Sequence, residues 1–349
     1  MTKYLNRKEL TVLIVTYQDH RKFLKQALEK LQKHAEFVEN VIIVQNGAEY
    51  NIHNFVESLS IPELTFITIT NSENQGSAGG FGIGIEKYQA MGAPKLLILD
   101  DDNYIPNETF DFLKNLDDKK VRAVYGEKIA ISLYRPQHDM DVTRFQREQD
   151  VNEHFFENTV HKFSVMHKLH SSKNYTQRPI REICETYIAP YSGIILEKQD
   201  IVNLEPIQRL YYVYGDDTRF TIMMSRAGIR ILKFKQAVSV DLEQSWYQNN
   251  TKQNGQEKSD VQLMLETDNV NKLWRPYYQI RNGVYTGKQL FKKNNSIFYL
   301  NLLIYCVMPF FVYMPKTKAG LRNYRFFLSA VFCGLFGKMG EINQKMFEA

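Results

Sequence analysis

Three consecutive carboxylates, Asp100, Asp101 and Asp102, follow the aliphatic run of residues 96–99. Four apolar residues in a row predict a short strand buried on both faces, which places the acids at its carboxyl end. Open α/β sheets bind ligands at that end, and neighbouring acids that repel one another are stabilised by a hard divalent cation between them. Because side chains alternate along a strand, we expect Asp100 and Asp102 to point the same way and Asp101 elsewhere. The triplet predicts a site for a metal ion and a diphosphate.

The alternative for this triplet is a solvated acidic turn like the EF-hand calcium loop. Such a loop needs further ligands and a glycine at fixed offsets. Residues 103–108 do not supply them, which favours the metal-diphosphate site.

A second pair of acids, Asp216 and Asp217, follows an aromatic run at residues 211–214 and opens a helix predicted to end at about Ala227. Acids at a helix N-terminus can serve only as a cap and as partners of the helix dipole. A transfer that expels a diphosphate, however, needs a separate carboxylate to take the proton of the attacking hydroxyl. Together with the triplet, this pair predicts the proton-accepting part of an active site.

The elements that must position these acids follow an α/β pattern. Residues 11–17 form a β-branched apolar run, residues 23–34 have apolar side chains at helical spacing, and residues 41–44 repeat the strand pattern. This order predicts a strand-helix-strand unit. Further strands predicted over residues 64–70 and 229–234 extend the sheet, so we expect an α/β fold.

A glycine-rich segment, residues 71–82, separates the third strand from a helix predicted over residues 83–91. Glycines let a backbone approach a phosphate closely, and a helix N-terminus offers N–H groups. We therefore expect a phosphate-binding loop. Close packing of the helix on the sheet explains the glycines about as well, since the segment is neither a Walker A sequence nor a dinucleotide fingerprint.

The middle of the chain contains a further strand, predicted over residues 121–125, and then a long polar segment, residues 132–178. The polar segment has little periodicity, and its histidines show no metal-ligand spacing. A long irregular insertion in an α/β domain is often a lid over the substrate. A surface excursion without that role explains the segment equally well.

The composition limits the partners and the compartment. The 349 residues carry 44 Lys and Arg against 39 Asp and Glu, and this net charge of +5 is too small to indicate a nucleic-acid partner. The three cysteines are widely spaced and form no disulfide or metal pattern, which fits a reducing cytosol. Residues 1–8 are polar and precede no apolar signal segment, so we expect the chemistry on the cytoplasmic side.

The last part of the chain changes character. Residues 296–314 contain no charged side chain, and a second apolar run covers residues 326–336. Lys292 and Lys293 precede the first run, and a group of Lys and Arg at residues 316–325 follows it. We favour helices that lie in the membrane interface, and the alternatives are a buried core hairpin and a membrane-spanning helix.

Six motifs occur in one order along the chain: Val15-Thr16-Tyr17, Asn74-Gln75-Gly76-Ser77-Ala78-Gly79-Gly80-Phe81, Leu99-Asp100-Asp101-Asp102, Tyr214-Gly215-Asp216-Asp217-Thr218-Arg219-Phe220, Tyr277-Tyr278-Gln279-Ile280-Arg281-Asn282 and Gly334-Leu335-Phe336-Gly337-Lys338-Met339-Gly340. Together they resemble the family-2 inverting glycosyltransferases of the GT-A fold, and within them the bacterial galactofuranosyl- and rhamnosyltransferase-like branch. The resemblance implies a mixed sheet flanked by helices as a catalytic domain over residues 1–270. It also implies a membrane-associating helical region over residues 271–349.

The resemblance also implies roles for particular residues. Asp100 and Asp102 would bind Mn²⁺ or Mg²⁺, Asp217 would be the catalytic base, and Asp216 would support it. The residues implied to bind the nucleotide-sugar donor are Thr16, Tyr17, Gln45, Asn46, Asn74, Gly76, Gly79, Gly80, Phe81, Asp100 and Asp101.

The chain departs from the family pattern at two places. Family members commonly carry an acid after the second strand, where this chain has Gln45 and Asn46, whose amides can hydrogen-bond a base or a ribose. Many members carry a histidine metal ligand where this chain has Asp241. Asp241 follows an alternating stretch, so we expect it at a strand end on the rim that carries Asp100, as a third metal ligand. A solvated acid beside Glu243 is the alternative.

The expected function is the transfer of a sugar from a nucleotide donor to a lipid-linked or growing cell-surface polysaccharide, such as a capsule or an O-antigen. UDP-galactofuranose is the first choice of donor and dTDP-rhamnose the second. The expected location is the inner face of the cell membrane, with peripheral attachment. The alternatives are a sugar nucleotidyltransferase and a non-catalytic assembly protein at the membrane. The oligomeric state, monomer or homo-oligomer, stays open.

Overall fold

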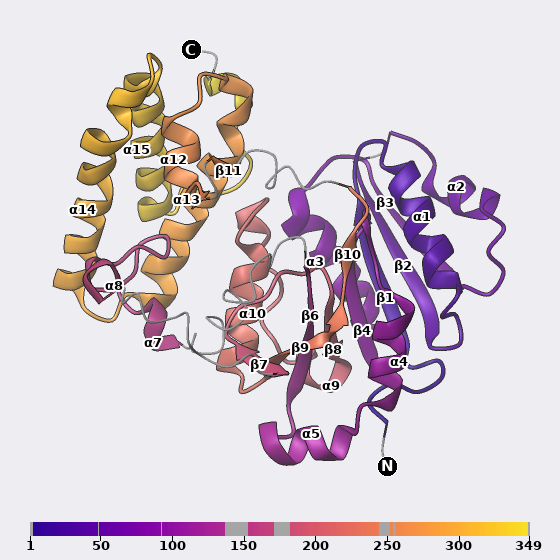
Figure 1. Cartoon of the computed structure of the whole chain (residues 1–349). Coiled ribbons are helices and arrows are strands. Elements are labelled where there is room, and N and C mark those ends of the chain that lie inside the picture. The colour runs from indigo at the N-terminus through magenta and orange to yellow at the C-terminus, as the bar shows by residue number, and fades with distance from the viewer. Residues whose placement is uncertain are drawn as a thin grey trace. The chain divides into compact units, whose positions relative to one another are not determined.

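The computed structural model describes residues 3–47, 49–91, 93–136, 153–170, 182–243, 252–253 and 256–347. The chain forms two compact units (Figure 1). We call the first the sheet unit; it comprises Met1–Val151, Thr176–Arg209 and Asp216–Gln244. We call the second the helical unit; it comprises Asn152–Tyr175, Leu210–Gly215 and Ser245–Ala349. The domain boundary predicted at residue 270 stays a prediction.

The sheet unit is built on an eight-stranded sheet in the order β3-β2-β1-β4-β8-β6-β9-β7. Strands β1 to β4 run parallel, β8 is antiparallel to both of its neighbours, β9 is parallel to β6, and β7 is antiparallel to β9. The predicted α/β class is therefore confirmed, with a mixed sheet. The strands are β1 Leu10–Thr16, β2 Val38–Asn46, β3 Phe66–Asn71, β4 Lys95–Asp100, β6 Ile129–Tyr134, β7 Ile183–Thr186, β8 Ile194–Glu197 and β9 Arg230–Val238.

Helices flank this sheet and bury their apolar faces against it. In α1, for example, Leu24, Ala27, Leu28 and Leu31 are buried, at the spacing that the sequence predicted for a helix in this region. The buried side chains of helices and strands join in one hydrophobic core. The helices of this unit are α1 Arg21–Gln32, α2 Ile52–Ser58, α3 Gly76–Gln89, α4 Asn107–Asn115, α5 Asp118–Tyr125, α9 Lys198–Ile201 and α10 Asp216–Arg226.

The prediction of a strand over residues 121–125 is wrong, because these residues lie in helix α5. The Asp117 side chain caps the helix by accepting a hydrogen bond from the Lys120 N–H, and Asp118 pairs with Arg122 one turn later at 2.9 Å. These local contacts outweigh the strand preference of two valines, of which Val124 is 66% exposed. The next strand is β6, which occupies the first residues of the polar segment that was predicted to be irregular.

The rest of that polar segment contains two short helices, α7 Glu153–Phe156 and α8 Val165–His170. Residues 137–152 and 171–178 lie outside the described residues. The predicted role of this segment as a lid therefore stays a prediction.

The predicted glycine-rich loop, residues 71–82, is shorter in the structure, because helix α3 already begins at Gly76. A Cβ on Gly80 would lie 2.6 Å from Val15 Cγ1, and one on Gly84 would lie 2.2 Å from Leu13 Cδ1. Both distances are far below van der Waals contact, so any larger side chain would push α3 off β1. The glycines at these two positions therefore serve close packing of the helix on the sheet, which was the alternative explanation.

The helical unit packs α13 between its neighbours around a second hydrophobic core. Ile280, Val284, Phe298 and Phe327 are fully buried in it. Its remaining elements are α12 Asp260–Leu265, α13 Trp274–Thr286, α14 Asn295–Val312, α15 Gly320–Phe336, the π-helix Gly287–Phe291, the 3₁₀ turns Val270–Lys272, Met314–Lys316 and Gln344–Phe347, and the two-residue strands β11 Lys252–Gln253 and β12 Gln256–Glu257.

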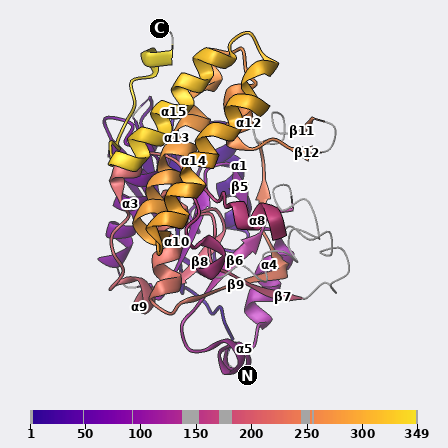
Figure 2. The ribbon, with the colours of Figure 1, turned by 90° about the vertical axis from the view of Figure 1, so that its left-hand side faces the viewer.

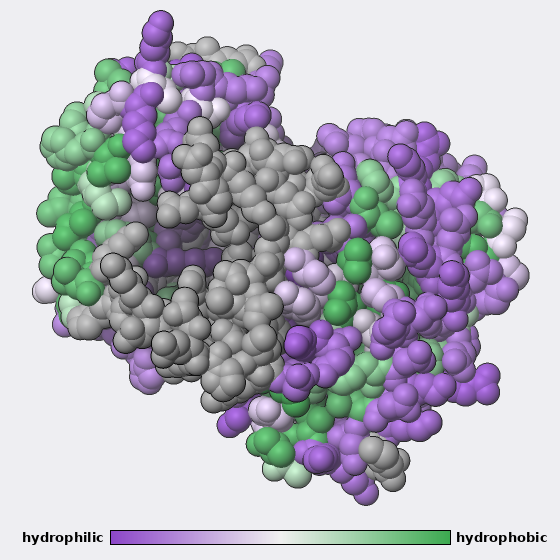
Figure 3. Space-filling model, viewed as in Figure 1, coloured by the Kyte–Doolittle hydropathy of each residue, from purple (hydrophilic) through white to green (hydrophobic). Residues whose placement is uncertain are grey.

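Helix α14 has two apolar faces. Phe298, Leu302 and Tyr305 are buried in the core of the helical unit, whereas Leu303 is 60% and Phe311 71% exposed. Figure 2 brings this helix to the front, and Figure 3 shows a hydrophobic surface over the same region. The segment Asn295–Lys316 is long and apolar enough to cross a membrane by length and composition, with 28% of its most apolar window buried within the protein. One face of the helix thus belongs to the core of the helical unit, and the membrane contact expected from the sequence stays a prediction.

Candidate active site

The acid triplet lies at the carboxyl end of β4, where Asp100 is the last strand residue. A second chain segment joins it there, because the two-residue strands β5 Asn103–Tyr104 and β10 Val240–Asp241 pair antiparallel, with Asp241 opposite Asn103. The Leu242 N–H donates to the Asp102 carbonyl at 2.7 Å, and Asn103 Nδ2 donates to Asp241 Oδ1 at 2.7 Å. Asp241 therefore lies beside Asp102 on one rim of the sheet, as the strand-end argument predicted, although its role as a ligand stays a prediction.

Negative charge is concentrated in this cluster. Burial raises the pKa of Asp102 to about 8, and the charges of Asp100, Asp101 and Asp241 add to the rise. Burial likewise raises the pKa of Asp100. One cation acts against both shifts: the guanidinium of Arg135 pairs with Asp241 Oδ1 at 2.7 Å. Arg135 follows directly after β6, in the segment that sequence reasoning assigned to an irregular insertion, so its place in the site was missed.

Asp101 points elsewhere, as the alternation of side chains predicted. Its carboxylate lies 3.2 Å from His20 Nδ1, at the residue before α1. The hydrogen bond to Asp101 is the largest cause that raises the pKa of His20. Asp101 is thus paired with His20 within the protein. After Arg135, His20 is the second residue of the site that the sequence analysis did not identify.

The donor chemistry of the triplet fits a hard divalent ion. The side chains of Asp100, Asp102 and Asp241 offer carboxylate oxygens, the ligands that Mn²⁺ and Mg²⁺ prefer, and a cation would relieve the repulsion that adds to the raised pKa values of Asp100 and Asp102. Among the residues that the structure describes, no three His, Cys, Asp or Glu side chains are gathered as a finished metal site. A bound diphosphate would offer further oxygen ligands to an ion held by these carboxylates.

The second acid pair opens helix α10. Asp216 is 3% exposed and accepts hydrogen bonds from Ser77 Oγ at 3.1 and 3.0 Å. Burial, and then the charge of Asp217, raise the pKa of Asp216 to about 8, although Ser77 acts against the rise. Asp217 is only half-buried and accepts a hydrogen bond from the Thr218 N–H at 2.6 Å. The pair thus consists of one buried, protonated acid and one more accessible acid.

Two adjacent residues, Tyr191 and Ser192, connect the acid groups. Burial raises the pKa of Tyr191 above its ordinary value, and the charges of Asp216 and Asp217 add to the effect. The hydroxyl of Ser192 acts on the other group, where it opposes the rise in the pKa of Asp100. The ring of Tyr191 lies 5.9 Å from that of Phe220 in α10, and the Gly193 N–H donates to the Ile98 carbonyl of β4 at 2.8 Å. The two elements that carry the acids therefore contact the same short segment of the sheet unit, residues 191–193.

The side chain of Asn46 holds the entry into α3 through three hydrogen bonds. Its Nδ2 donates to Asn74 Oδ1 at 3.0 Å and to the Gly76 carbonyl at 2.8 Å, and its Oδ1 accepts from the Gln75 N–H at 3.0 Å. Gly76 has a φ of +69°, in the left-handed region. The predicted binding residues Asn46, Asn74 and Gly76 are therefore joined in a brace, and their contact with a nucleotide stays a prediction.

The other predicted binding residues lie in different surroundings. Thr16 and Gln45 are opposite one another at the ends of β1 and β2, and both are fully buried, whereas Tyr17 is exposed. A Cβ on Gly79 would lie 2.4 Å from Gln75 Cβ within the first turn of α3. Phe81 is buried against Tyr191, with ring centroids 4.6 Å apart. Of these residues, Tyr17 is the one most open to solvent.

A strap at residues 210–215, in the helical unit, leads directly into Asp216. Asn282 Nδ2 lies 3.0, 2.9 and 2.7 Å from the carbonyl oxygens of Tyr211, Val213 and Tyr214, so its two N–H groups are shared among three acceptors. Tyr212 and Tyr214 have φ values of +64°, a conformation that costs free energy in residues other than glycine. The motif of residues 277–282 was identified from the sequence, but its use as a clamp on this strap was not.

Comparisons with known proteins agree with this architecture. Residues 11–169 match the family model described as Glycosyl transferase family 2. A search of curated protein sequences finds no match.

Three solved structures are similar to this chain. GalNAc-T7, crystallised with UDP, GalNAc and Mn²⁺, superposes with a TM-score of 0.52 at 10% identity over 98% of this chain, which spans 58% of that one. The mannosyltransferase PcManGT from Pyrobaculum calidifontis, in complex with GDP-Man and Mn²⁺, gives 0.49 at 13% identity, with 95% of this chain and 88% of that chain covered. TarS from S. aureus gives 0.43 at 13% identity, with 93% and 49% covered. The chain therefore has the GT-A fold of glycosyltransferases, and the family-2 model matches its residues 11–169.

Proposed function

We propose that this protein is a metal-dependent, inverting glycosyltransferase that uses a nucleotide-sugar donor. The observation that carries the proposal is the pair of acid groups in the sheet unit, one around Asp102 and one at Asp217, on two elements that both contact residues 191–193. Transfer of a sugar from a nucleoside diphosphate needs neutralisation of the leaving diphosphate and a base for the acceptor hydroxyl. The acid group around Asp102 would supply the first function through a bound cation, and the acid pair at Asp217 would supply the second.

The surroundings of each acid indicate its role in the proposed reaction. Asp100 and Asp102 would hold a divalent ion such as Mn²⁺, which would offset charge on the departing diphosphate. Burial raises the pKa of Asp216 to about 8, which favours its protonated form at neutral pH, so we assign the part of the base to Asp217. The more accessible Asp217 then accepts the proton of the acceptor hydroxyl, and Asp216 with Ser77 fixes the start of α10.

The sequence motifs support a finer assignment within this proposal. They resemble the galactofuranosyl- and rhamnosyltransferase-like branch, which favours UDP-galactofuranose as donor and dTDP-rhamnose as the second choice. A lipid-linked or growing cell-surface polysaccharide is then the acceptor. GalNAc-T7, which shares the fold, was crystallised with UDP, and this agrees with a uridine nucleotide.

A panel of nucleotide sugars tests the proposal. The purified protein is incubated with each donor and Mn²⁺, and release of nucleoside diphosphate is measured with and without a chelator. We expect slow donor hydrolysis for one donor or a few, and loss of that hydrolysis when the metal is removed. If no donor is hydrolysed or transferred under any metal, the fold is used for a purpose other than catalysis.

We also propose that α14 attaches the protein to the inner face of the cell membrane. Leu300, Leu303, Val307 and Phe311 are exposed along one side of the helix, at the spacing of a single stripe. Lys292 and Lys293 precede the helix, and Lys and Arg residues follow it at residues 316–325. An apolar stripe with basic ends is complementary to an anionic lipid surface.

Sedimentation with anionic lipid vesicles measures this attachment. The double substitution Leu300→Glu and Leu303→Glu should move the protein from the vesicle pellet to the supernatant. Val124→Glu is the matched control, because Val124 is equally exposed but belongs to the sheet unit. Equal sedimentation of all three proteins would contradict attachment through α14.

A further inference from the structure

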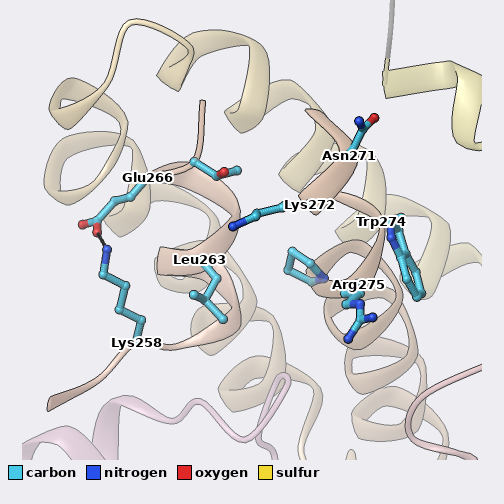
Figure 4. Close-up of a pocket in the computed structure, with 9 residues that line it drawn as sticks. Lys258, Leu263, Glu266, Asn271, Lys272, Trp274 and Arg275 are labelled. Carbon is cyan, nitrogen blue, oxygen red and sulfur yellow. Dashed lines mark ion pairs between the residues drawn. The ribbon is translucent and has the colours of Figure 1, made fainter. Parts of the chain in front are cut away.

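The helical unit contains a pocket of about 380 Å³ that the proposed chemistry does not use (Figure 4). It lies between α12, the 3₁₀ turn Val270–Lys272 and the first turn of α13. Its volume falls within the range of small-molecule sites. The residues that line it are Lys258, Leu263, Glu266, Thr267, Asn271, Lys272, Trp274, Arg275 and Pro276.

The pocket carries a net positive charge. Its one acid, Glu266, is paired with Lys258 at 2.9 Å and with Lys316 at 2.8 Å. Burial opposes the ionisation of Glu266, but the hydrogen bonds from these two lysines outweigh it and lower its pKa. The lining therefore contains three cationic side chains, those of Lys258, Lys272 and Arg275, and this one carboxylate. In Figure 4 the Lys272 side chain extends across the pocket toward α12.

The remaining walls suit a sugar ring. Trp274 is half-buried, and its indole offers an apolar face of the kind on which the C–H side of a sugar packs. The guanidinium of Arg275 lies 4.9 Å from the centroid of this ring, so positive charge and the aromatic face are adjacent. Thr267 and Asn271 add a hydroxyl and an amide that can hydrogen-bond sugar hydroxyls. Cations, an aromatic face and neutral polar groups together match a sugar that bears an anionic group.

The pocket is linked to the strap that precedes the proposed base. The rings of Trp274 and Tyr214 are 6.2 Å apart, within the range of aromatic pairs, and Tyr214 stands two residues before Asp216 in the chain. The same helix, α13, also carries Asn282, which holds the strap carbonyls. A ligand against Trp274 would therefore contact the element that shapes the chain leading into Asp217.

From this charge, this chemistry and this link, we propose that the pocket binds a phosphate- or carboxylate-bearing sugar of the acceptor glycan. The proposal rests on the glycosyltransferase function proposed above and adds the chemical class of the acceptor. The donor site belongs to the sheet unit, so a separate anion site in the helical unit gives the second substrate its own recognition.

Fluorescence of Trp274 provides a direct test in the full-length protein. The chain has two tryptophans, so Trp246→Phe leaves Trp274 as the single reporter. This protein is titrated with an oligogalacturonate, with a neutral malto-oligosaccharide of equal length, with inorganic phosphate and with anionic vesicles, and calorimetry is run in parallel. We expect the oligogalacturonate to bind at least about tenfold more tightly than the neutral sugar, since charge-assisted hydrogen bonds are stronger than neutral ones.

Substitutions locate the binding. Lys272→Gln and Arg275→Gln should each weaken oligogalacturonate binding at least about fivefold. Lys338→Gln is the control, because Lys338 is an exposed lysine of the same unit outside the pocket, and it should change nothing.

Three results would overturn the proposal: equal affinity for the neutral sugar, binding that Lys272→Gln and Arg275→Gln leave unchanged, or a Trp274 response to vesicles and not to the oligogalacturonate. If that vesicle response persists when Leu300→Glu and Leu303→Glu remove attachment through α14, the pocket binds lipid head groups. Donor hydrolysis by the unaltered protein, measured beside these titrations, separates the two proposals. Hydrolysis without sugar binding removes the pocket assignment only, and sugar binding without hydrolysis removes the glycosyltransferase proposal only.

Discussion

Replacing Asp102 by Asn should stabilise the metal-free protein at neutral pH. Burial, together with the charges of Asp100, Asp101 and Asp241, raises the pKa of Asp102 to about 8. The folded state therefore keeps a proton that the unfolded chain, with an ordinary aspartate pKa of about 4, releases. Asn has nearly the same shape and never carries the charge, so it removes this coupling between folding and proton binding.

The sign and size of the effect follow from the two pKa values. Below about pH 4 both states hold the proton, and Asp102 costs no stability. Between about pH 4 and pH 8 only the folded state holds it, so stability falls by about 1.4 kcal/mol for each pH unit. At pH 7 the cost is about 4 kcal/mol, an upper limit because water can enter the site. Since each kcal/mol shifts the melting temperature of a unit of roughly 200 residues by about 2–4 °C, we expect Asp102→Asn to raise it by at least about 3 °C.

Thermal unfolding, followed by circular dichroism at pH 5, 7 and 8.5, measures this effect in a chelator and again in Mn²⁺. The advantage of Asp102→Asn should grow from pH 5 to pH 8.5 in the chelator. It should disappear or reverse in Mn²⁺, because the ion stabilises the unaltered carboxylates. Asp101→Asn is the control of opposite sign, since it removes the partner that lies 3.2 Å from His20. If Asp102→Asn and the unaltered protein melt together at pH 8.5 without metal, the argument from a buried, protonated Asp102 is wrong.

Three further substitutions test the other parts of the site. Asp217→Asn should leave donor affinity near normal and lower turnover at least about a hundredfold, because an amide cannot accept the proton; a larger loss of diphosphate release in Asp216→Asn would exchange the two roles. Asn282→Ala should lower kcat at least about tenfold with the donor Kd unchanged, since three strap carbonyls lose their hydrogen bonds from the Asn282 amide; an unaltered kcat would show that the strap does not depend on Asn282. Asp241→Ala should raise the Mn²⁺ concentration needed for the half-maximal rate, and an unchanged Mn²⁺ titration would remove Asp241 from the ligands.

The framework of the site was predictable because its acids stand where apolar runs end. The strand before Asp100 stops abruptly at three charges, and the aromatic run before Asp216 passes into a helix with regular spacing. Strand alternation also predicted that Asp101 points away from Asp102, and Asp101 indeed pairs with His20. These features depend on neighbours in the chain, which one sequence displays directly.

The predicted boundaries of helices and strands were wrong where tertiary contacts override the local preference of the residues for helix or strand. Glycines disfavour helices, so residues 76–82 were expected to form a loop, yet they form the first turns of α3. Contacts at Gly80 and Gly84 with the sheet explain this, because only glycine allows the helix to lie so close to β1. Helix α5 was missed for the reverse reason, since its valines favour a strand but its Asp117 cap and its ion pair favour a helix.

The hydrogen-bond and ion-pair partners of the site residues could not be predicted from a single sequence. Arg135 meets Asp241 across 106 positions of the chain, and Ser77 meets Asp216 across 139. Asn282 lies 71 residues from the first strap carbonyl that it holds. A serine, an arginine or an asparagine at such distances carries no local pattern, so only the fold shows which acids they contact.

Calorimetric titration of the nucleoside diphosphate in Mn²⁺ tests the central claim, a division of labour between the two acid groups, most directly. The unaltered protein and Asp217→Asn should bind the nucleotide with similar affinity, because Asp217 acts only on the acceptor. Asp102→Ala should lose the Mn²⁺-dependent part of the binding, since the diphosphate would then face Asp100 and Asp101 with the cation poorly held. Unchanged nucleotide affinity of Asp102→Ala in Mn²⁺ would contradict the account.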